Sequence, residues 1–449
     1  MFKKYLMFLL LMFLLIFTVL GCGTDYMLSS FYLRNNDLKW MLFPSQQTNL
    51  DYYTHIVGNS KINEYNSPVI IATPQNYILS IYEYRNEPQS TVENIIGING
   101  QKRVNVKVAI SKNAETFNTK LDVGNTAFMS SDSHGSPIGF VDKNGNVIVL
   151  AVEGIGFGAQ SDADAITPIG MSISTNDGYK WTDWTNIVNT NTFKSLLDKN
   201  YNRFYTTSGK GITLRNGTLV CMIDYKKHTT PGPGYNPEGA AILYSKNDGK
   251  DWQIGATMEY TGAASGKRFA KIIAERSDGK LLIAAVGNTG NNYNNNSGIY
   301  WGLATSLEGT ISDLDVTGLP NNSGGNVSGD KITFSKDGRL INGLILVHST
   351  PNREYKNPNG AIQIVKNAMS ISVSEDEGKT WVLLKDTFGS PANKTTFKQD
   401  LKVLKDGSIV ICSEEGNELE ITQYRLFNIV FRRIGLSAVS DGEYSYEGL

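Results

Sequence analysis

Short apolar segments recur along most of the 449-residue chain, and a pair of turn-forming residues interrupts them at intervals. Five of these pairs are Asn-Gly or Asp-Gly, which favour two-residue hairpins because they accept positive φ angles; a sixth, Gln-Asn, is weaker. The pairs lie at residues 75–76, 144–145, 216–217, 278–279, 337–338 and 406–407. Their nearly regular spacing predicts six repeated units of β structure.

A second turn motif runs in step with the hairpins. It has the pattern Ser-x-Asp/Asn-x-Gly-x-x-Trp and occupies Ser174–Trp181, Ser245–Trp252 and Ser374–Trp381. The Asp or Asn side chain can bond backbone N–H groups of the turn, Gly supplies a positive φ, and Trp packs beneath the loop. A shortened copy starts at Ser111, and the place of a further copy retains only Gly309. Each repeat therefore contains two hairpin turns.

Two hairpins per repeat predict four antiparallel strands, so the chain is expected to be an all-β, six-bladed β-propeller of four-stranded blades. Two β-sandwiches in tandem would explain the short strands but would not explain the repeat period. We assign residues 61–449 to the propeller and residues 22–60 to an N-terminal tether. We also expect Trp181, Trp252 and Trp381 to hold equivalent places in their blades.

The N-terminus has the pattern of an export signal. Two lysines precede an apolar run over residues 5–20, and Gly21-Cys22 follows it. Residues 1–21 are therefore expected to be a signal peptide, and the Gly-Cys junction resembles that of a bacterial lipoprotein, which implies lipidation of Cys22. An ordinary leader and an uncleaved anchor are the alternatives. The lipoprotein hypothesis predicts an exported protein, anchored in a membrane at the outer membrane or cell surface.

Composition and charge narrow the partners. The formal net charge is −1, which argues against nucleic acid as a partner. Cys221 and Cys412 each lie in an apolar strand, so buried free thiols are favoured over a disulfide. The 4 histidines are scattered and no Cys/His cluster has metal-ligand spacing, so we expect no transition metal and no cofactor.

The Ser-x-Asp/Asn-x-Gly-x-x-Trp turns have the pattern of the motif called the Asp box. These Asp boxes and the six repeats resemble the sialidase (neuraminidase) superfamily of BNR-repeat propellers, over about residues 60–435. In that family the substrate binds at the face opposite the Asp boxes, where the inner strands begin and the second strands end. The resemblance implies three arginines that hold the sialic acid carboxylate. It also implies a Tyr nucleophile with a Glu partner, and an Asp acid/base.

Most of this catalytic set has no counterpart in the chain. Asn66 stands where the first arginine is implied, and residues 396–399, Thr-Phe-Lys-Gln, stand where the Tyr is implied. Ser265-Gly-Lys-Arg268 takes the place of the catalytic Glu, and Val286-Gly-Asn288 takes that of the second arginine. Only Arg85, within Tyr82-Glu-Tyr-Arg85, matches an arginine element of the family.

The remaining catalytic candidates are weak. Glu87 or Glu93 would have to serve as acid/base, and Lys366 or Arg353 as the third cation. Glu414 or Glu415 matches an acidic residue that follows the last hairpin of the family. We retain as catalytic candidates Arg85, Glu93, Arg268, Arg353 and Glu414.

Side chains expected on the ligand face suit glycans. The aromatic rings of Tyr225, Tyr235, Tyr293 and Trp301 could stack on sugars, although packing within turns is the alternative. The polar candidates also include Lys226. We take as ligand-binding candidates Glu83, Arg85, Asp224, Tyr225 and Arg268.

The sequence therefore predicts an exported sialidase-superfamily lipoprotein that contacts glycans, which could be sialylated, and is divergent or non-catalytic. An active exo-α-sialidase with a rearranged site is the alternative, and a structural lipoprotein without a glycan ligand is a third hypothesis. We expect the cations not to converge on one carboxylate, and Phe397 or Lys398 to hold the place of the nucleophile.

Overall fold

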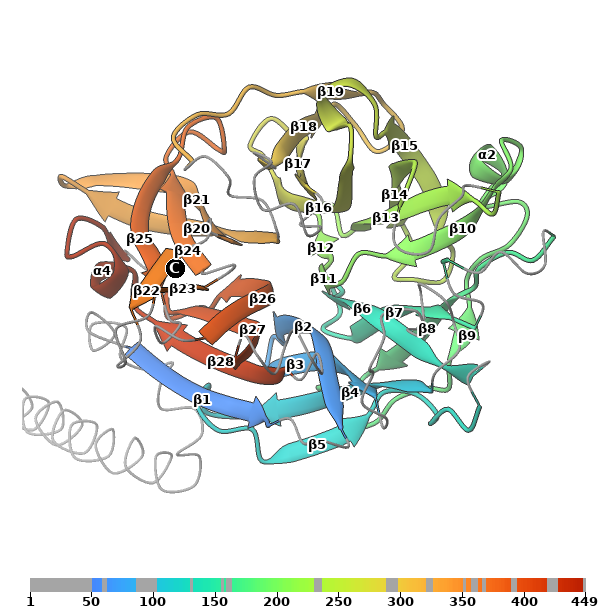
Figure 1. Cartoon of the computed structure of the whole chain (residues 1–449), viewed down its shortest axis with the longest axis horizontal. Helices are drawn as coiled ribbons and strands as arrows, with labels where there is room; N and C mark the ends of the chain where they lie inside the picture. Colours follow the sequence, from blue (N-terminus) through green and yellow to red (C-terminus); the bar gives the residue numbers. More distant parts are fainter. Residues whose placement is uncertain are drawn as a thin grey trace, which may run out of the picture.

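The computed structural model confirms the six-bladed propeller. Six antiparallel sheets follow one another around a central axis (Figure 1). The structure describes residues 51–58, 63–85, 103–129, 132–154, 157–158, 164–229, 236–287, 298–319, 326–349, 353–356, 362–365, 369–388, 394–417 and 427–446.

Each blade runs from an inner strand beside the axis to an outer strand at the rim. The first blade contains β2 (Glu64–Ala72), β3 (Ile78–Arg85), β4 (Val104–Ser111) and β5 (Thr119–Asp122). The second contains β6 (His134–Val141), β7 (Val147–Glu153), β8 (Ile169–Ser174) and β9 (Thr185–Asn186), with β11 (Gly209–Lys210) parallel to β6. The third contains β10 (Tyr201–Thr206), β12 (Ile212–Thr213), β13 (Leu219–Lys227), β14 (Gly239–Ser245) and β15 (Gln253–Glu259).

The second half of the chain repeats the arrangement. The fourth blade contains β16 (Lys267–Glu275), β17 (Leu281–Gly287), β18 (Tyr300–Ala304) and β19 (Ile311–Asp313). The fifth contains β20 (Val327–Lys336), β21 (Arg339–Ser349), β24 (Met369–Ser374), β25 (Val382–Phe388) and β29 (Ser445–Tyr446). The sixth contains β26 (Lys394–Val403), β27 (Ile409–Asn417), β28 (Asn428–Ile434) and β1 (Asp51–Val57). Outside the blades lie the hairpin of β22 (Arg353–Lys356) and β23 (Ile362–Val365), and the short helices α2 (Lys194–Leu197), η5 (Gly262–Ala264) and α4 (Leu436–Val439).

The N-terminal strand β1 closes the ring. It pairs antiparallel with β28 as the outer strand of the sixth blade, with Asp51 opposite Ile434. Its Ile56 and Val57 are buried in a core that strands of the sixth and first blades share. The closing strand therefore lies inside the segment that the sequence assigned to the tether.

The two kinds of turn define one face of the propeller. The predicted hairpins connect inner and second strands, and the Asp boxes connect third and outer strands, so both lie on what we call the Asp-box face. The inner strands begin, and the second strands end, at the opposite face, which we call the candidate ligand face. The predicted hairpins are confirmed, with positive φ at Asn76, Gly145, Gly217, Gly279, Gly338 and Gly407.

The three complete Asp boxes have one hydrogen-bond pattern. The serine hydroxyl accepts the N–H of Gly178, Gly249 or Gly378 at 2.9, 3.0 and 2.8 Å. The Asn or Asp oxygen accepts the N–H of the residue before the tryptophan, at 2.8, 2.9 and 2.8 Å. In the shortened copy Asn113 accepts two backbone N–H groups in the same way. The predicted role of the Asp or Asn is therefore confirmed.

Each box glycine fits closely against the preceding blade. A Cβ atom would lie 2.6 Å from Leu79 Cδ2 at Gly178, 3.1 Å from Ile148 Cδ1 at Gly249, and 2.4 Å from Leu282 Cδ2 at Gly378. The leucines and the isoleucine all lie on second strands, β3, β7 and β17. The glycine is thus required both by its positive φ and by this close approach.

Each box tryptophan contacts the blade before its own. Trp252 packs on Phe140 of the second blade with ring centroids 5.5 Å apart, and Trp381 stacks on Trp301 of the fourth at 5.6 Å. Trp181 is partly buried against the core that contains Leu79 of the first blade. Every box therefore covers the blade before it.

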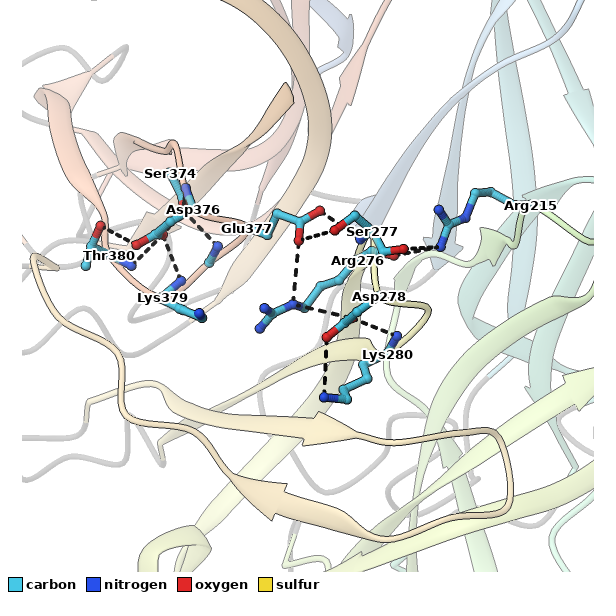
Figure 2. A network of polar contacts seen from close by, with 11 residues as sticks. Arg215, Arg276, Ser277, Asp278, Lys280, Ser374, Asp376, Glu377, Lys379 and Thr380 are labelled. Atoms are coloured by element: carbon cyan, nitrogen blue, oxygen red, sulfur yellow. Dashed lines mark hydrogen bonds and ion pairs between the residues drawn. The ribbon is translucent and has the colours of Figure 1, made fainter. Parts of the chain in front are cut away.

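Polar contacts reinforce these junctions on the Asp-box face. Figure 2 shows Glu377 of the fifth-blade box, which accepts hydrogen bonds from the Ser277 backbone N–H at 2.7 Å and the Ser277 hydroxyl at 2.8 Å. Arg215 of the third blade donates to the Arg276 carbonyl at 2.8 Å. In the third-blade box, the carboxylate of Asp248 accepts a hydrogen bond from the side-chain amide of Asn144, in the second-blade hairpin, at 3.2 Å. The boxes thus hold the hairpin turns of neighbouring blades.

The middle of the axis is filled by side chains. Lys210 of β11 donates to the carbonyl of Gly329 at 2.5 Å and to that of Leu401, and its amine lies 3.7 Å from Asp330. These contacts join β11, which pairs with the second blade, to the fifth and sixth blades. Lys402 forms an ion pair with Asp330 at 2.7 Å in the same region. A ligand at the axis therefore has to bind at one end of it.

Cys221 and Cys412 are buried free thiols, as predicted. Among the residues that the structure describes, no helix is long and apolar enough to cross a membrane.

Trp381→Ala should destabilise the protein by about 3–5 kcal/mol, because the indole is buried between two blades and its removal leaves a large cavity. Urea denaturation would measure the free energy of unfolding. Trp181→Ala is the matched control, with a smaller loss expected because Trp181 is only partly buried. Equal losses in the two variants would contradict the role assigned to this junction.

Candidate functional site

Three inner strands carry a bulge near the point where they begin. The register of strand pairing shifts around Ser67, Ser136 and Phe269, and these residues have φ angles of 57°, 53° and 55°. Such angles are uncommon for residues other than glycine, and bulges often turn side chains toward a site. The bulges therefore indicate that a binding site lies at the candidate ligand face rather than at the Asp-box face.

A carboxylate from the preceding blade holds each bulge. The N–H of Ser67 donates to Glu414 at 2.5 Å, and that of Ser136 donates to Glu83 at 2.5 Å. The N–H of Phe269 donates to Asp224 at 2.7 Å. We call these three contacts the bulge clasps. They give Glu83, Asp224 and Glu414, all candidates from the sequence, a defined place at the junctions between blades.

Arg85 ends β3 in a buried ionic cluster. Its Nη1 atom lies 3.0 Å from Glu64 Oε1, and its Nη2 atom is bonded to Glu83 Oε2. Asn66, which stands where the family has an arginine, donates to the same Glu64 oxygen at 2.8 Å. Burial disfavours ionisation, but Glu83 and Glu64 raise the pKa of Arg85. Two carboxylates thus compensate the charge of this guanidinium.

Lys398 of β26 supplies a second cation. Its Nζ atom donates to the Ser67 hydroxyl at 2.6 Å. Burial opposes the charge, but Tyr205, Glu414 and Glu83 together raise the pKa of Lys398. Glu414 is affected in the opposite way, because burial raises its pKa to about 7 although Lys398 favours the ionised form. Near neutral pH the cluster therefore contains a carboxyl group that is partly protonated.

Glu83 remains ionised within this cluster. Burial alone would raise its pKa, but Arg85 and Lys398 outweigh that effect and lower the pKa. Its two oxygens are engaged, one by Ser136 and one by Arg85. Glu83 therefore links a bulge clasp to the ionic cluster.

Tyr205 of β10 is the main site residue that the sequence did not indicate. It is buried, and burial raises its pKa, with Glu83 and Lys398 also acting on it electrostatically. The sequence around it, Tyr201–Thr206, is an ordinary strand pattern without a motif. Only the ring closure brings this third-blade side chain toward residues of the first and sixth blades.

The structure brings together some candidates and separates others. Glu83, Arg85 and Glu414 meet Lys398, which is one of the two residues expected at the place of the nucleophile. The other, Phe397, packs on Phe427 with centroids 5.1 Å apart. The polar group at this position of β26 is therefore an amine rather than a phenol.

The fourth-blade candidates occupy a neighbouring position. The guanidinium of Arg268 stacks on the ring of Phe269 at 5.1 Å, and that ring lies 6.3 Å from Tyr205. Asp224, besides its clasp, accepts a hydrogen bond from Tyr260 at 2.6 Å. Polar side chains therefore lie at this end of the axis from the first blade to the fourth.

The aromatic candidates that the structure describes pack against other rings of the protein. Tyr225 is buried and lies 4.5 Å from Tyr201, and Trp301 is buried against Trp381. Both placements favour packing over ligand contact, as does that of Lys226, which lies over the Phe157 ring at 5.0 Å. The candidates outside the described residues are Glu87, Glu93, Tyr235, Tyr293, Lys366 and the side chain of Arg353.

No group of three or more His, Cys, Asp or Glu side chains in the described ranges is arranged to hold a metal ion.

Comparison with known proteins identifies the class of this propeller. A family model described as a BNR repeat-like domain matches residues 86–364, which is more than half of the chain. The chain therefore belongs to the BNR repeat-like family. No curated protein matches the chain.

Solved sialidase structures share the fold. The Hadza microbial sialidase Hz136 has a TM-score of 0.58 and 19% identity, covering 84% of this chain and 66% of its own. The Trypanosoma rangeli sialidase in complex with sialic acid has a TM-score of 0.58 and 12% identity, and the match covers 88% of this chain and 59% of that protein. The intramolecular trans-sialidase from Ruminococcus gnavus, in complex with oseltamivir carboxylate, has a TM-score of 0.58 and 13% identity, and the match covers 86% of this chain and 97% of that protein. This chain thus spans slightly less than two thirds of the first two proteins.

Glu414→Gln should change how stability depends on pH. The pKa of Glu414 is about 7 in the folded protein and near 4.5 in the unfolded chain, so the folded state binds this proton more tightly. The contribution of the carboxyl group to stability is therefore full below pH 4.5 and is lost as pH rises toward 7.

The amide can still accept the Ser67 N–H but does not titrate. The variant should therefore gain stability relative to the wild type between pH 4.5 and 7.5, by up to about 3 kcal/mol. Urea denaturation of both proteins across this interval would measure the difference. Parallel pH profiles would show that Glu414 does not titrate as described.

Proposed function

We propose that this protein binds glycans at the candidate ligand face and does not release sialic acid. The observation that carries the proposal is the compensation of Arg85 by Glu64 and Glu83. A sialic acid carboxylate needs cationic donors that are free to form paired hydrogen bonds. At this position an anionic sugar would meet two carboxylates already bound to the guanidinium.

The other groups of the cluster support binding over catalysis. Lys398 is held in its charged form and so lacks the lone pair of a nucleophile. Tyr205 has a raised pKa, which disfavours the phenolate. Carboxylates, an amine and hydroxyl groups are instead suited to the hydroxyls of a sugar, which both donate and accept hydrogen bonds.

An exo-α-sialidase with a rearranged site is the second candidate. The proximity of Tyr205 and Glu83 favours it, because a tyrosine beside a glutamate is the pair that the sialidase resemblance implies. In that function the Tyr205 oxygen would bond to the anomeric carbon as the glycosidic bond breaks, Glu83 would take the phenolic proton, and the departing aglycone oxygen would take a proton from water. The engagement of both Glu83 oxygens by other donors argues against this second role.

We further propose export and lipid anchoring at Cys22, which precedes the described residues. The leader pattern of residues 1–21 supports this proposal.

Cys22→Ser should release the protein from membranes, because the variant cannot carry the lipid. Membrane fractionation of the producing cells would compare it with the wild type, which should be released only by detergent. Cys221→Ser is the control, because that thiol is buried within the propeller. Membrane association of Cys22→Ser equal to the wild type would refute the anchor.

The activity test uses the mature chain with a fluorogenic sialoside and a glycan array. We expect no turnover, and binding to at least one glycan. Lys398→Gln should weaken that binding about tenfold or more, the scale of one charge-assisted hydrogen bond. Lys402→Gln, four positions further along the same strand and paired with Asp330, should bind like the wild type. Release of sialic acid that Tyr205→Phe abolishes would establish the second candidate instead.

A further inference from the structure

Two exposed apolar side chains lie at the candidate ligand face. Phe128 is 83% exposed and Met129 is 64% exposed, whereas most large apolar residues of the described chain are buried. Single exposed apolar residues are common, so exposure alone indicates nothing. Here the two are adjacent, and their position relative to the ionic cluster is defined by hydrogen bonds.

The segment that carries them is fixed on both sides. The Ala127 N–H donates to the Asn105 side chain at 2.8 Å, and the Asp132 N–H donates to the Met129 carbonyl at 3.1 Å. Ala127 itself is buried. The aromatic ring is therefore presented from an anchored backbone, which lowers the entropy that a ligand must remove on binding.

Ser133 connects this segment to the strand beside Arg85. Its hydroxyl accepts the Val104 N–H at 2.9 Å and donates to the Met129 carbonyl at 3.5 Å, and Val104 is the strand partner of Arg85 in the first blade. The chain then enters β6, where the Ser136 N–H is bound to Glu83. The backbone of Met129 is therefore linked through Ser133 to the strand that pairs with Arg85.

We propose that Phe128, flanked by Met129, is a stacking subsite for one sugar ring of the glycan. This inference rests on the proposed binding function. A pyranose has an apolar face of C–H groups and a rim of hydroxyls, and an aromatic ring binds the apolar face. The neighbouring ionic cluster binds hydroxyls of the adjoining sugar. The ligand class is therefore an oligosaccharide of at least two residues rather than a monosaccharide.

The geometry favours a glycan over a lipid surface. The segment of Phe128 follows β5 at the candidate ligand face, whereas β1 begins at the Asp-box face. An exposed aromatic beside buried hydrogen-bonding groups is typical of a small-molecule site.

The test compares Phe128→Ala and Phe128→Trp with Leu340→Ala in the mature chain. Leu340 is 65% exposed and lies in β21 next to a hairpin of the Asp-box face, so it is a matched control. Isothermal titration with the oligosaccharide bound best on the array should show about 3- to 30-fold weaker binding for Phe128→Ala. Phe128→Trp should keep or improve affinity, and Leu340→Ala should equal the wild type. Because Phe128 is exposed, unfolding midpoints of all variants should match.

The outcomes separate this inference from the function on which it rests. Wild-type binding that Phe128→Ala leaves unchanged would overturn the subsite while the proposed function stands. Absence of glycan binding by the wild type would overturn both. Sedimentation of the Cys22→Ser protein with vesicles of phosphatidylethanolamine and phosphatidylglycerol provides the second arm. Vesicle binding that Phe128→Ala abolishes would assign the residue to a lipid surface and refute the glycan subsite.

Discussion

The structure depends on the contact between each Asp box and the second strand of the preceding blade. A glycine at positive φ lets the turn approach Leu79, Ile148 or Leu282 so closely that a Cβ atom has no room. The box tryptophan then covers the same junction. Three of the six junctions between blades, those that precede the second, third and fifth blades, carry such a contact. These contacts fix how the three blades lie against their neighbours, and hence how their inner strands lie around the axis.

The bulge clasps also join neighbouring blades, at the candidate ligand face. A carboxylate on one second strand fixes the bulged inner strand of the next blade, as Glu83 fixes Ser136. Glu83 and Glu414 are also the charges that act on Arg85 and Lys398. Structural and electrostatic roles therefore coincide in these side chains, and a loss of binding in a Glu83 variant would not by itself identify a ligand contact. Lys398 is a more direct probe, because it holds no clasp.

The sequence predicted those features that depend on local backbone chemistry. The hairpin pairs and Asp boxes require particular residues at fixed offsets, so the blade number and the two faces could be derived from them. The bulge clasps could not, because they join residues such as Ser67 and Glu414 that are 347 positions apart. The position of Tyr205 beside residues of the first and sixth blades likewise depends on closure of the propeller ring. The closing strand β1 also lacked a signal, since an outer strand at the rim carries no box or hairpin of its own.

Under the proposed function, the electrostatics of the axis set this scaffold apart from an anion-binding one. An arginine holds a ligand carboxylate best when no carboxylate of the protein compensates its charge, and here Glu64 and Glu83 each accept a hydrogen bond from one terminal nitrogen of Arg85. Asn66, in place of an arginine, adds a neutral donor to Glu64 rather than a charge. Replacing water at this cluster by a charged sugar would therefore cost desolvation without a compensating ion pair. A neutral ligand that offers hydroxyls avoids this cost, because it can donate to the carboxylates and accept from the amine of Lys398 at once.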